Sequence, residues 1–335
     1  MHSSRLAAAG LGFVLAAASV IIVEAQRGGR AQQPAAPPPA TVPVVPAPRM
    51  PLAPPAVRGA SVTPALEGWI KNDDGTTTIL VGYMNRNQDQ TLDVPVGPNN
   101  SIEPGGPDFG QPTHFEVGRN YGVFSVTVPK DFGTKRLTYT ISVNNQPQTI
   151  TLGLANGYQV SPYIRSDTGN TPPVVKLDAN GPELTGPPKG AAKTLAATVG
   201  QPLMLTLYAT DKGNTISQQD QSAAPDAALA AARGGRGGRQ NPISVTWHKH
   251  RGPAGDTLKF EPSNPMVAAD AEAVKLFAKP GDYTGKATTI VTFSEAGEYW
   301  LRAQINDATG NGGGGDQCCW SNVLLKINVQ AAPAR

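Results

Sequence analysis

Apolar and polar residues alternate along most of the chain after position 66, with the period of two that strands with one buried face require. In TTTILVGYMN the inward positions are Ile79, Val81 and Tyr83, and the same alternation recurs in YGVFSVTVP and KRLTYTISV. The runs NDDG and NNQP stand at the turns of this pattern and are typical of hairpins. Because helical periodicity is missing here, the pattern predicts an antiparallel β-sandwich over residues 58–165.

A second alternating region follows the proline-closed connection RSDTGNTPP. A polar and glycine-rich stretch, residues 212–241, interrupts the alternation and is interpreted as a flexible insertion between two strands. The region predicts a second sandwich over residues 172–330, so the fold class is all-β with two antiparallel sandwiches in tandem. Its inward positions are Leu203, Leu205, Leu207, Ile243, Val245, Trp247, Tyr299, Leu301, Ala303, Ile305, Val323, Leu325, Ile327 and Val329.

Two parts of the chain resemble known protein modules. In EAGEYWLRAQIND, a glycine two residues before Tyr299 leads into an alternating strand, which resembles the tyrosine corner of immunoglobulin-like sandwiches of the PKD and cadherin-like branch. Trp247 stands where such folds bury a tryptophan, and Leu301 stands where antibody domains have a cysteine. The first region, residues 66–133, resembles a module of uncharacterised exported bacterial proteins, which implies architecture and export but no site residues.

The first residues carry the pattern of a secretory signal. Arg5 precedes an apolar run from Leu6 to Val23, and the small residues at Ala25 fit a cleavage site, so residues 1–25 are expected to be a signal peptide. The run also reaches the lower limit of a membrane span, which leaves an uncleaved N-terminal anchor as the alternative. Residues 26–57 are rich in proline and alanine, so we expect a low-complexity, disordered linker there. These features predict an exported protein, periplasmic or extracellular.

The overall charge argues against a nucleic-acid partner. With 28 basic and 25 acidic residues, the formal net charge is only +3, too small for broad attraction to nucleic acid or anionic lipid. The run RGGRGGR at 233–239 resembles an RNA-binding box, but in an exported chain it is interpreted as a solvated loop. No later segment is apolar enough to cross a membrane.

Cys318 and Cys319 are the only cysteines and are adjacent. An oxidising compartment favours a disulfide, but neighbouring Cα atoms lie about 3.8 Å apart, closer than an ordinary disulfide requires. The glycines before them give the backbone the freedom to adopt such a ring. Three alternatives stay open: a vicinal disulfide, two unpaired thiols, or an intermolecular bridge or metal.

The outer face of the second sandwich carries the candidate site residues. Alternation places Trp300 and Arg302 outward, with His248 and His250 on the same sheet and Leu324 and Trp320 beside them. Such a cluster indicates either a binding surface or an interface with the first domain or the insertion. The two histidines lack a third ligand for zinc, since His114 lies in the other domain, so they are expected to be exposed on a polar face.

No metal or cofactor is predicted. The loops NNSIEPGGPDFGQPTH and DATGNGGGGD are rich in oxygen ligands, but neither has an ordered calcium-loop spacing, and their residues are those that turns use. The chain has no G-x-S-x-G, H-E-x-x-H or C-x-x-C motif, and its carboxylates Glu67, Asp73, Asp74 and Glu103 are expected in turns.

The function expected from these features is non-catalytic binding, adhesion or scaffolding at the cell envelope, with an envelope protein or a glycan as the partner. One alternative is a carbohydrate-binding accessory module that uses Trp300 and Trp320. A further alternative is a hydrolase with a loop-built or metal site, because sandwiches host many functions. Neither the ligand nor the oligomeric state follows from the sequence.

Overall fold

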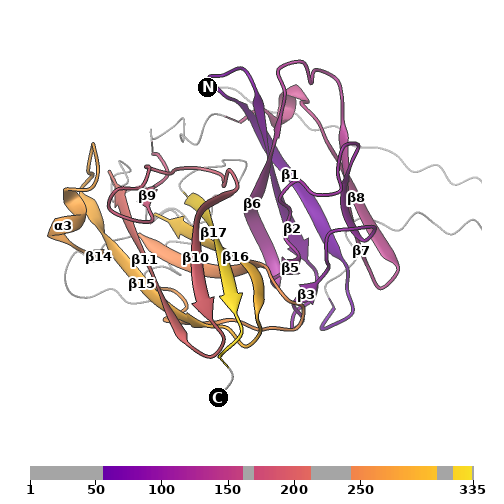
Figure 1. The fold of residues 1–335 in the computed structure, drawn as a ribbon. Coiled ribbons are helices and arrows are strands. Elements are labelled where there is room, and N and C mark those ends of the chain that lie inside the picture. Colours follow the sequence, from indigo (N-terminus) through magenta and orange to yellow (C-terminus); the bar gives the residue numbers. More distant parts are fainter. Residues whose placement is uncertain (1–55, 161–169, 213–242, 308–319, 334–335) are drawn as a thin grey trace, which may run out of the picture. The chain divides into compact units, whose positions relative to one another are not determined.

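The structure is a computed structural model that describes residues 56–160, 170–212, 243–307 and 320–333. Its regular structure is almost entirely strand, which confirms the all-β prediction (Figure 1). The described residues lie within one compact unit, Arg49–Arg335, that holds two separate hydrophobic cores. The expected signal peptide, almost all of the linker, the insertion, and Cys318 and Cys319 lie outside the described residues.

The first sandwich packs two three-stranded sheets, with strand orders β1-β2-β6 and β4-β7-β8, and a short β3-β5 ladder beside them. Its core takes residues from Val62 to Leu152, and the predicted inward positions of all three runs are buried in it. The strands are β1 Val62–Lys71, β2 Thr77–Asn85, β3 Leu92–Asp93, β4 Asn100–Glu103, β5 His114–Phe115, β6 Gly118–Val128, β7 Leu137–Val143 and β8 Gln146–Leu152, and a single 3-10 turn, η1, spans Asn156–Tyr158.

Both predicted hairpins of this sandwich are confirmed. Strand β1 returns as β2 through a turn in which the Gly75 amide donates to the Asn72 carbonyl at 2.9 Å. Strand β7 returns as β8 through Asn144 and Asn145, both with positive φ, the geometry of a type I′ turn. Asparagine tolerates this backbone region better than most residues, which explains the choice of two asparagines here.

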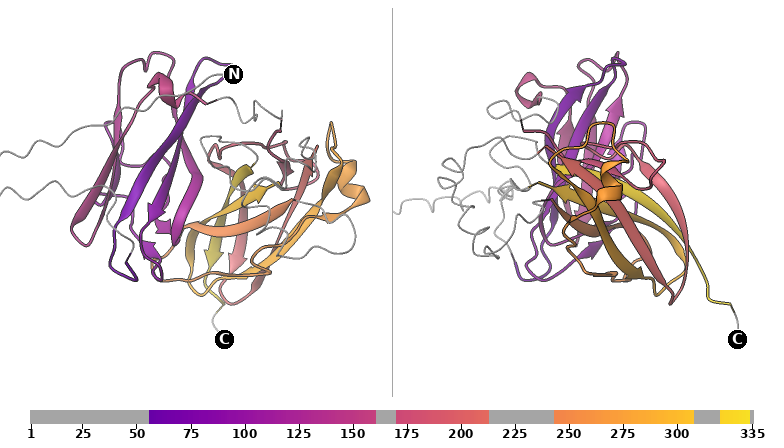
Figure 2. Two further views of the ribbon diagram at one scale, coloured as in Figure 1. Left: turned by 180° about the vertical axis from the view of Figure 1, so that it is seen from behind. Right: turned by 90° about the vertical axis from the view of Figure 1, so that its left-hand side faces the viewer.

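The second sandwich packs a four-stranded sheet of order β10-β17-β16-β12 on a sheet of order β13-β15-β11-β9, which β14 joins through β15 (Figures 1 and 2). The β10-β17 pair is parallel, the one departure from the antiparallel pattern among these ladders. The elements are β9 Val174–Lys176, β10 Ala191–Thr198, β11 Pro202–Asp211, β12 Ser244–Arg251, β13 Lys259–Glu261, β14 Ala268–Ala269, α3 Ala271–Val274, β15 Tyr283–Thr292, β16 Gly297–Asn306 and β17 Trp320–Gln330.

The structure contains the tyrosine corner that the sequence resemblance implied. The Tyr299 hydroxyl donates to the carbonyl of Glu295, four residues upstream, at 3.1 Å. The same proton is shared with the Asp256 carboxylate, which lies 2.5 Å from the hydroxyl oxygen, and Ser294 donates to the second oxygen of that carboxylate at 2.7 Å. Trp247 is buried as expected, and β12, β16 and β17 share one sheet. The immunoglobulin-like interpretation of the second domain therefore agrees with the fold.

Candidate functional site

The outer face of β12, β16 and β17 does not face solvent, because the first sandwich covers it. Arg302 is 1% exposed, Trp320 0% and Leu324 2%, so the expected exposure of these three side chains is wrong. Alternation correctly predicted that these side chains point away from the core of the second sandwich. Of the two interpretations of this face, its geometry is that of an interface between the two domains.

Arg302 lies at the centre of this interface and is held by side-chain amides. Its guanidinium donates to the Gln304 and Asn322 amide oxygens at 3.1 and 3.2 Å, and across the interface to that of Asn120 at 3.2 Å. Burial lowers the pKa of Arg302 below its ordinary value, while the charges of Glu116 and Glu67 oppose this shift. An arginine nevertheless stays protonated in proteins, so the interface contains a buried positive charge.

Trp320 inserts from β17 into the first sandwich. Its ring packs with Ile70 and Leu80, which point out of the first sandwich's own core. The indole also lies directly over Gly122, whose φ is +50°, and a Cβ at this position would overlap the ring. Beside it, the Asn322 amide donates to the Gly122 carbonyl at 2.8 Å. Position 122 therefore needs glycine both for its backbone conformation and for the close approach of Trp320.

A β-bulge places a second buried charge next to this contact. The register of β1 against β2 shifts between Leu66 and Gly68, which makes Glu67 the extra residue. Its carboxylate accepts from Arg119 and from the Gly122 amide, both at 2.5 Å. Burial raises the pKa of Glu67, and Arg119 partly offsets that shift. Glu67 therefore lies within strand β1, and the expectation that it lies in a turn is wrong.

The histidines of β12 lie inside the junction. His250 is 1% exposed, and its Nε2 contacts the Gly110 carbonyl of the first sandwich at 2.9 Å, so the predicted exposed position of this side chain is wrong. Burial lowers the pKa of His250 to about 3, which keeps the ring neutral with its proton on Nε2. His248 is half-buried, and burial together with the Arg302 charge holds its pKa well below the ordinary value.

An ion pair closes the junction at the end of β12. Both terminal nitrogens of Arg251 donate to the Asp108 carboxylate, at 2.7 and 3.0 Å, and its Nε donates to the Gln111 carbonyl at 2.7 Å. The hydrogen bond from Arg251 lowers the pKa of Asp108. The same guanidinium lies over the half-buried Trp300 ring, 5.3 Å from its centre. Of the site residues predicted from the sequence, Trp300 and His248 keep partial exposure.

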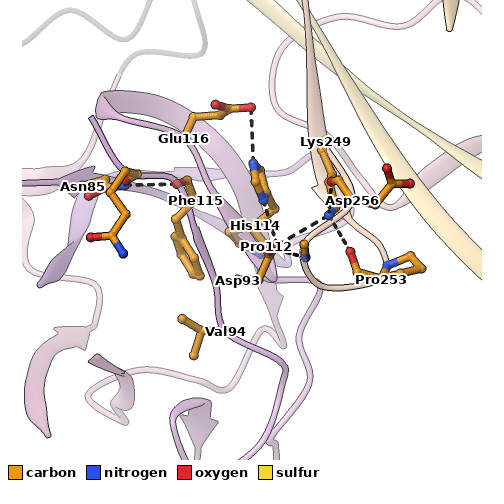
Figure 3. A network of polar contacts seen from close by, with 12 residues as sticks. Asn85, Asp93, Val94, Pro112, His114, Phe115, Glu116, Lys249, Pro253 and Asp256 are labelled. Carbon is orange, nitrogen blue, oxygen red and sulfur yellow. Dashed lines mark hydrogen bonds and ion pairs between the residues drawn. The ribbon is translucent and has the colours of Figure 1, made fainter. Parts of the chain in front are cut away.

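A further polar network joins the two sandwiches at their β5 and β12 edges (Figure 3). Asp93 accepts from His114 Nδ1 at 2.8 Å and from the Gly255 amide of the second sandwich at 2.9 Å. The Lys249 ammonium lies 3.6 Å from Asp93 and donates to two carbonyls of the loop that follows β12. Burial alone would lower the pKa of His114, but its contacts with Asp93 and Glu116 raise it. His114 belongs to the first sandwich, but through Asp93 it lies at the interface with the second.

Residues of the oxygen-rich loop at 99–114, for which no calcium site is predicted, make structural contacts. Asp108 pairs with Arg251, and the buried Asn100 amide donates to the carbonyls of Val94 and Pro112 at 2.8 Å. In the stretches that the structure describes, no three His, Cys, Asp or Glu side chains are placed to hold a metal ion together. Most of the second loop, 307–316, lies outside the described residues.

Sequence reasoning did not identify Asp93, Arg119, Gly122, Asp108 or Arg251 as interface residues. One signal was present in TTTILVGYMN, because apolar residues such as Leu80 also occupy the positions between the inward ones, which indicates a strand buried on both faces. Every position of strand β2 is buried except Met84, and Leu80 lies on the face that meets Trp320. A second signal is the group of Arg302, Gln304 and Asn322 on one outward sheet face. A covering domain can offer hydrogen-bond partners to such polar side chains, as Asn120 does for Arg302.

Two clefts open where the sandwiches meet. The larger, about 1010 Å³, is lined by polar residues of both sandwiches, among them Asp74, Thr127 and Lys189. The smaller, about 420 Å³, lies between His114 and Glu116 of the first sandwich and Trp247 and Phe260 of the second. None of the helices in the described ranges is long and apolar enough to span a membrane.

Comparison with known proteins gives distant structural likenesses only. No protein family matches the chain, and no curated protein matches it either. Among solved structures, the secreted serine protease VesC from Vibrio cholerae is 9% identical, with 65% of this chain and 35% of VesC covered and a TM-score of 0.25. The adhesin InvE from Yersinia pseudotuberculosis is 13% identical over 80% of this chain and 58% of InvE, with a TM-score of 0.21. Tandem immunoglobulin domains of titin are 10% identical over 82% of this chain and 100% of theirs, with a TM-score of 0.19. Scores this low carry no argument about function.

Proposed function

We propose that the chain is an exported, non-catalytic binding and scaffolding protein of the cell envelope, in which the two sandwiches act as one unit at the end of a proline-rich spacer. The observation that carries this proposal is the interface itself. Charged side chains make hydrogen bonds that join the two sandwiches: Arg302 with Asn120, Arg251 with Asp108, and Asp93 with the Gly255 amide.

The chemistry of the buried titratable groups supports a structural role for this face. His250 is kept neutral against a backbone carbonyl, and the Lys249 ammonium is bound by the carbonyls of Pro253 and Asp256 at 2.6 and 2.8 Å. A general acid or base needs a proton-accepting or proton-donating atom within reach of a substrate. The partners of these groups are backbone groups and neighbouring side chains, which favours scaffolding over acid–base chemistry.

The N-terminal segment supports export, and a spacer of this composition would hold the sandwiches away from the membrane or wall. The test is expression of the full chain with a C-terminal tag, followed by cell fractionation and by sedimentation of the purified protein with isolated envelopes. We expect the tag outside the cytoplasm and the protein in the envelope pellet. Recovery in the cytoplasm, or no sedimentation with envelopes, would overturn the proposal.

A further inference from the structure

The smaller cleft has an aromatic floor at the open edge of the second sandwich. Trp247 on β12 and Phe260 on β13 belong to opposite sheets, and their rings stack with centres 6.1 Å apart and planes inclined by 21°. Trp247 is buried, whereas Phe260 is half-buried. Both line the cleft of about 420 Å³, so an aromatic surface lies at its base.

The wall opposite this floor is polar and comes from the first sandwich. His114 and Glu116 line it, with His114 Nε2 3.5 Å from the Glu116 carboxylate. A carboxylate accepts about four hydrogen bonds, so Glu116 retains acceptor capacity toward the cleft. Lys259 and Glu261, both exposed on β13, add one charge of each sign to the lining, which also includes Lys249.

This combination selects the chemical class of the ligand. The lining carries both positive and negative groups, which gives no preference for a strongly charged molecule. An aromatic face packs best against an apolar surface of the ligand. The carboxylates accept hydrogen bonds and the ammonium groups donate them, and a hydroxyl group can pair with either. A sugar ring offers both, since one face is lined by C–H groups and its edge carries hydroxyls. The volume fits the lower range of small-molecule pockets, about 300–1,000 Å³.

We infer that this cleft binds a saccharide, with one ring packed on Phe260 and its hydroxyls bonded to Glu116 and Lys259. The site exists only where the sandwiches are docked, because the floor comes from one and the wall from the other. Docking through Asp93 and Gly255 therefore preorganises the site. The inference rests on the proposed binding role and gives it a ligand class and a location that Trp300 and Trp320 do not supply.

The experiment is titration of the full chain with laminarihexaose, cellohexaose and chitohexaose, followed by calorimetry. The variants are Phe260→Leu, which keeps an apolar side chain on Trp247 but removes the aromatic ring, and Glu116→Gln. Tyr158→Ala, at an exposed aromatic residue in η1 of the first sandwich, is the matched control. Thermal unfolding of each variant separates loss of the site from loss of the fold.

We expect saturable binding of at least one of the three sugars, weakened by about tenfold or more in Phe260→Leu, which corresponds to about 1.4 kcal/mol. Glu116→Gln should weaken it in the same direction, and Tyr158→Ala should leave it unchanged. No saturable binding up to about 10 mM, or equal affinity in Phe260→Leu, would overturn the inference. If the chain sedimented with envelopes but bound none of these sugars, this site would be refuted, while the proposed function would remain supported.

Discussion

Position 122 accepts no side chain in the docked structure. An alanine there would adopt a left-handed conformation, which costs roughly 1–2 kcal/mol, and its methyl group would overlap the rigid Trp320 ring, which adds about 1–3 kcal/mol of overpacking. We therefore expect Gly122→Ala to lower the free energy of unfolding by about 2–5 kcal/mol, measured by urea denaturation.

Gly59 provides the control for this substitution. Its φ is +80°, also left-handed, but a Cβ there meets no atom within 4 Å. Gly59→Ala should show the conformational cost alone, so the difference between the two variants measures the contact with Trp320. Equal destabilisation by the two substitutions would contradict the close approach seen at Gly122.

His250 should make the protein less stable in mild acid. Its pKa is about 3 when folded and about 6.5 when unfolded, so between these values the unfolded chain binds more protons and stability falls as the pH falls. The slope contributed by one such group is at most about 1.4 kcal/mol per pH unit. His250→Gln should flatten the dependence of unfolding free energy on pH between about 6 and 4. If the unfolding free energy of the variant depended on pH as steeply as that of the unaltered protein, protonation of His250 would not destabilise the folded state.

His114 should act in the opposite direction and in a different pH range. Its pKa is raised by Asp93 and Glu116, so its contribution to stability is complete below the unfolded value of about 6.5 and is lost as the pH rises through the folded value. His114→Gln should therefore reduce stability most at pH 5 to 6 and least in alkali. Urea denaturation across pH 5 to 9 measures this, and a loss of stability that is equal at every pH would exclude the charged pairings.

At the scale of elements, the tyrosine corner links β16 to the loop that follows β12. Removing the Tyr299 hydroxyl would leave the buried Asp256 carboxylate with Ser294 as its remaining hydroxyl donor. A buried acceptor that loses its partner costs about 1–3 kcal/mol. We expect Tyr299→Phe to lower the free energy of unfolding by that amount, while Tyr158→Phe, at an exposed site, changes it little. If Tyr299→Phe left the free energy of unfolding unchanged, the hydrogen bonds of the corner would contribute nothing to stability.

The strand elements were predictable from the sequence because period-two alternation directly reports which side chains share a face. Val323, Leu325, Ile327 and Val329 are all buried as expected. The bulge at Glu67 was not predictable, since an inserted residue interrupts the alternation on which the prediction depends. The single-turn helix α3 was also missed, although Asp270 caps it by accepting from the amides of Glu272 and Ala273.

At the scale of the whole molecule, alternation could not predict what covers an outward face. The direction of Arg302 follows from its strand, but its burial depends on a first sandwich that lies far away in sequence. Docking of two folded units depends on shape, as at Gly122, and on exact pairings such as Asp108 with Arg251. Those contacts join residues more than a hundred positions apart, so no local pattern records them.

The same contacts determine how the molecule unfolds. Arg302 bonds Asn120 across the interface, and Trp320 packs on Ile70 and Leu80, so neither sandwich can open without exposing polar and apolar surface of the other. We therefore expect one cooperative calorimetric transition for the full chain. Arg302→Met should separate it into two, because the amide oxygens of Asn120, Gln304 and Asn322 lose their buried donor at a cost of about 1–3 kcal/mol each.

Lys326→Met is the matched control, since Lys326 lies on the neighbouring strand but pairs with the exposed Glu298. An exposed ion pair contributes about 0–1 kcal/mol, so this variant should keep the single transition and nearly the same Tm. Two transitions in the unaltered protein would show that the sandwiches unfold independently despite their contacts. A single transition in Arg302→Met at the original Tm would show that the buried guanidinium does not couple them, and the remaining contacts, among them Trp320 with Leu80 and Arg251 with Asp108, would then hold the junction together.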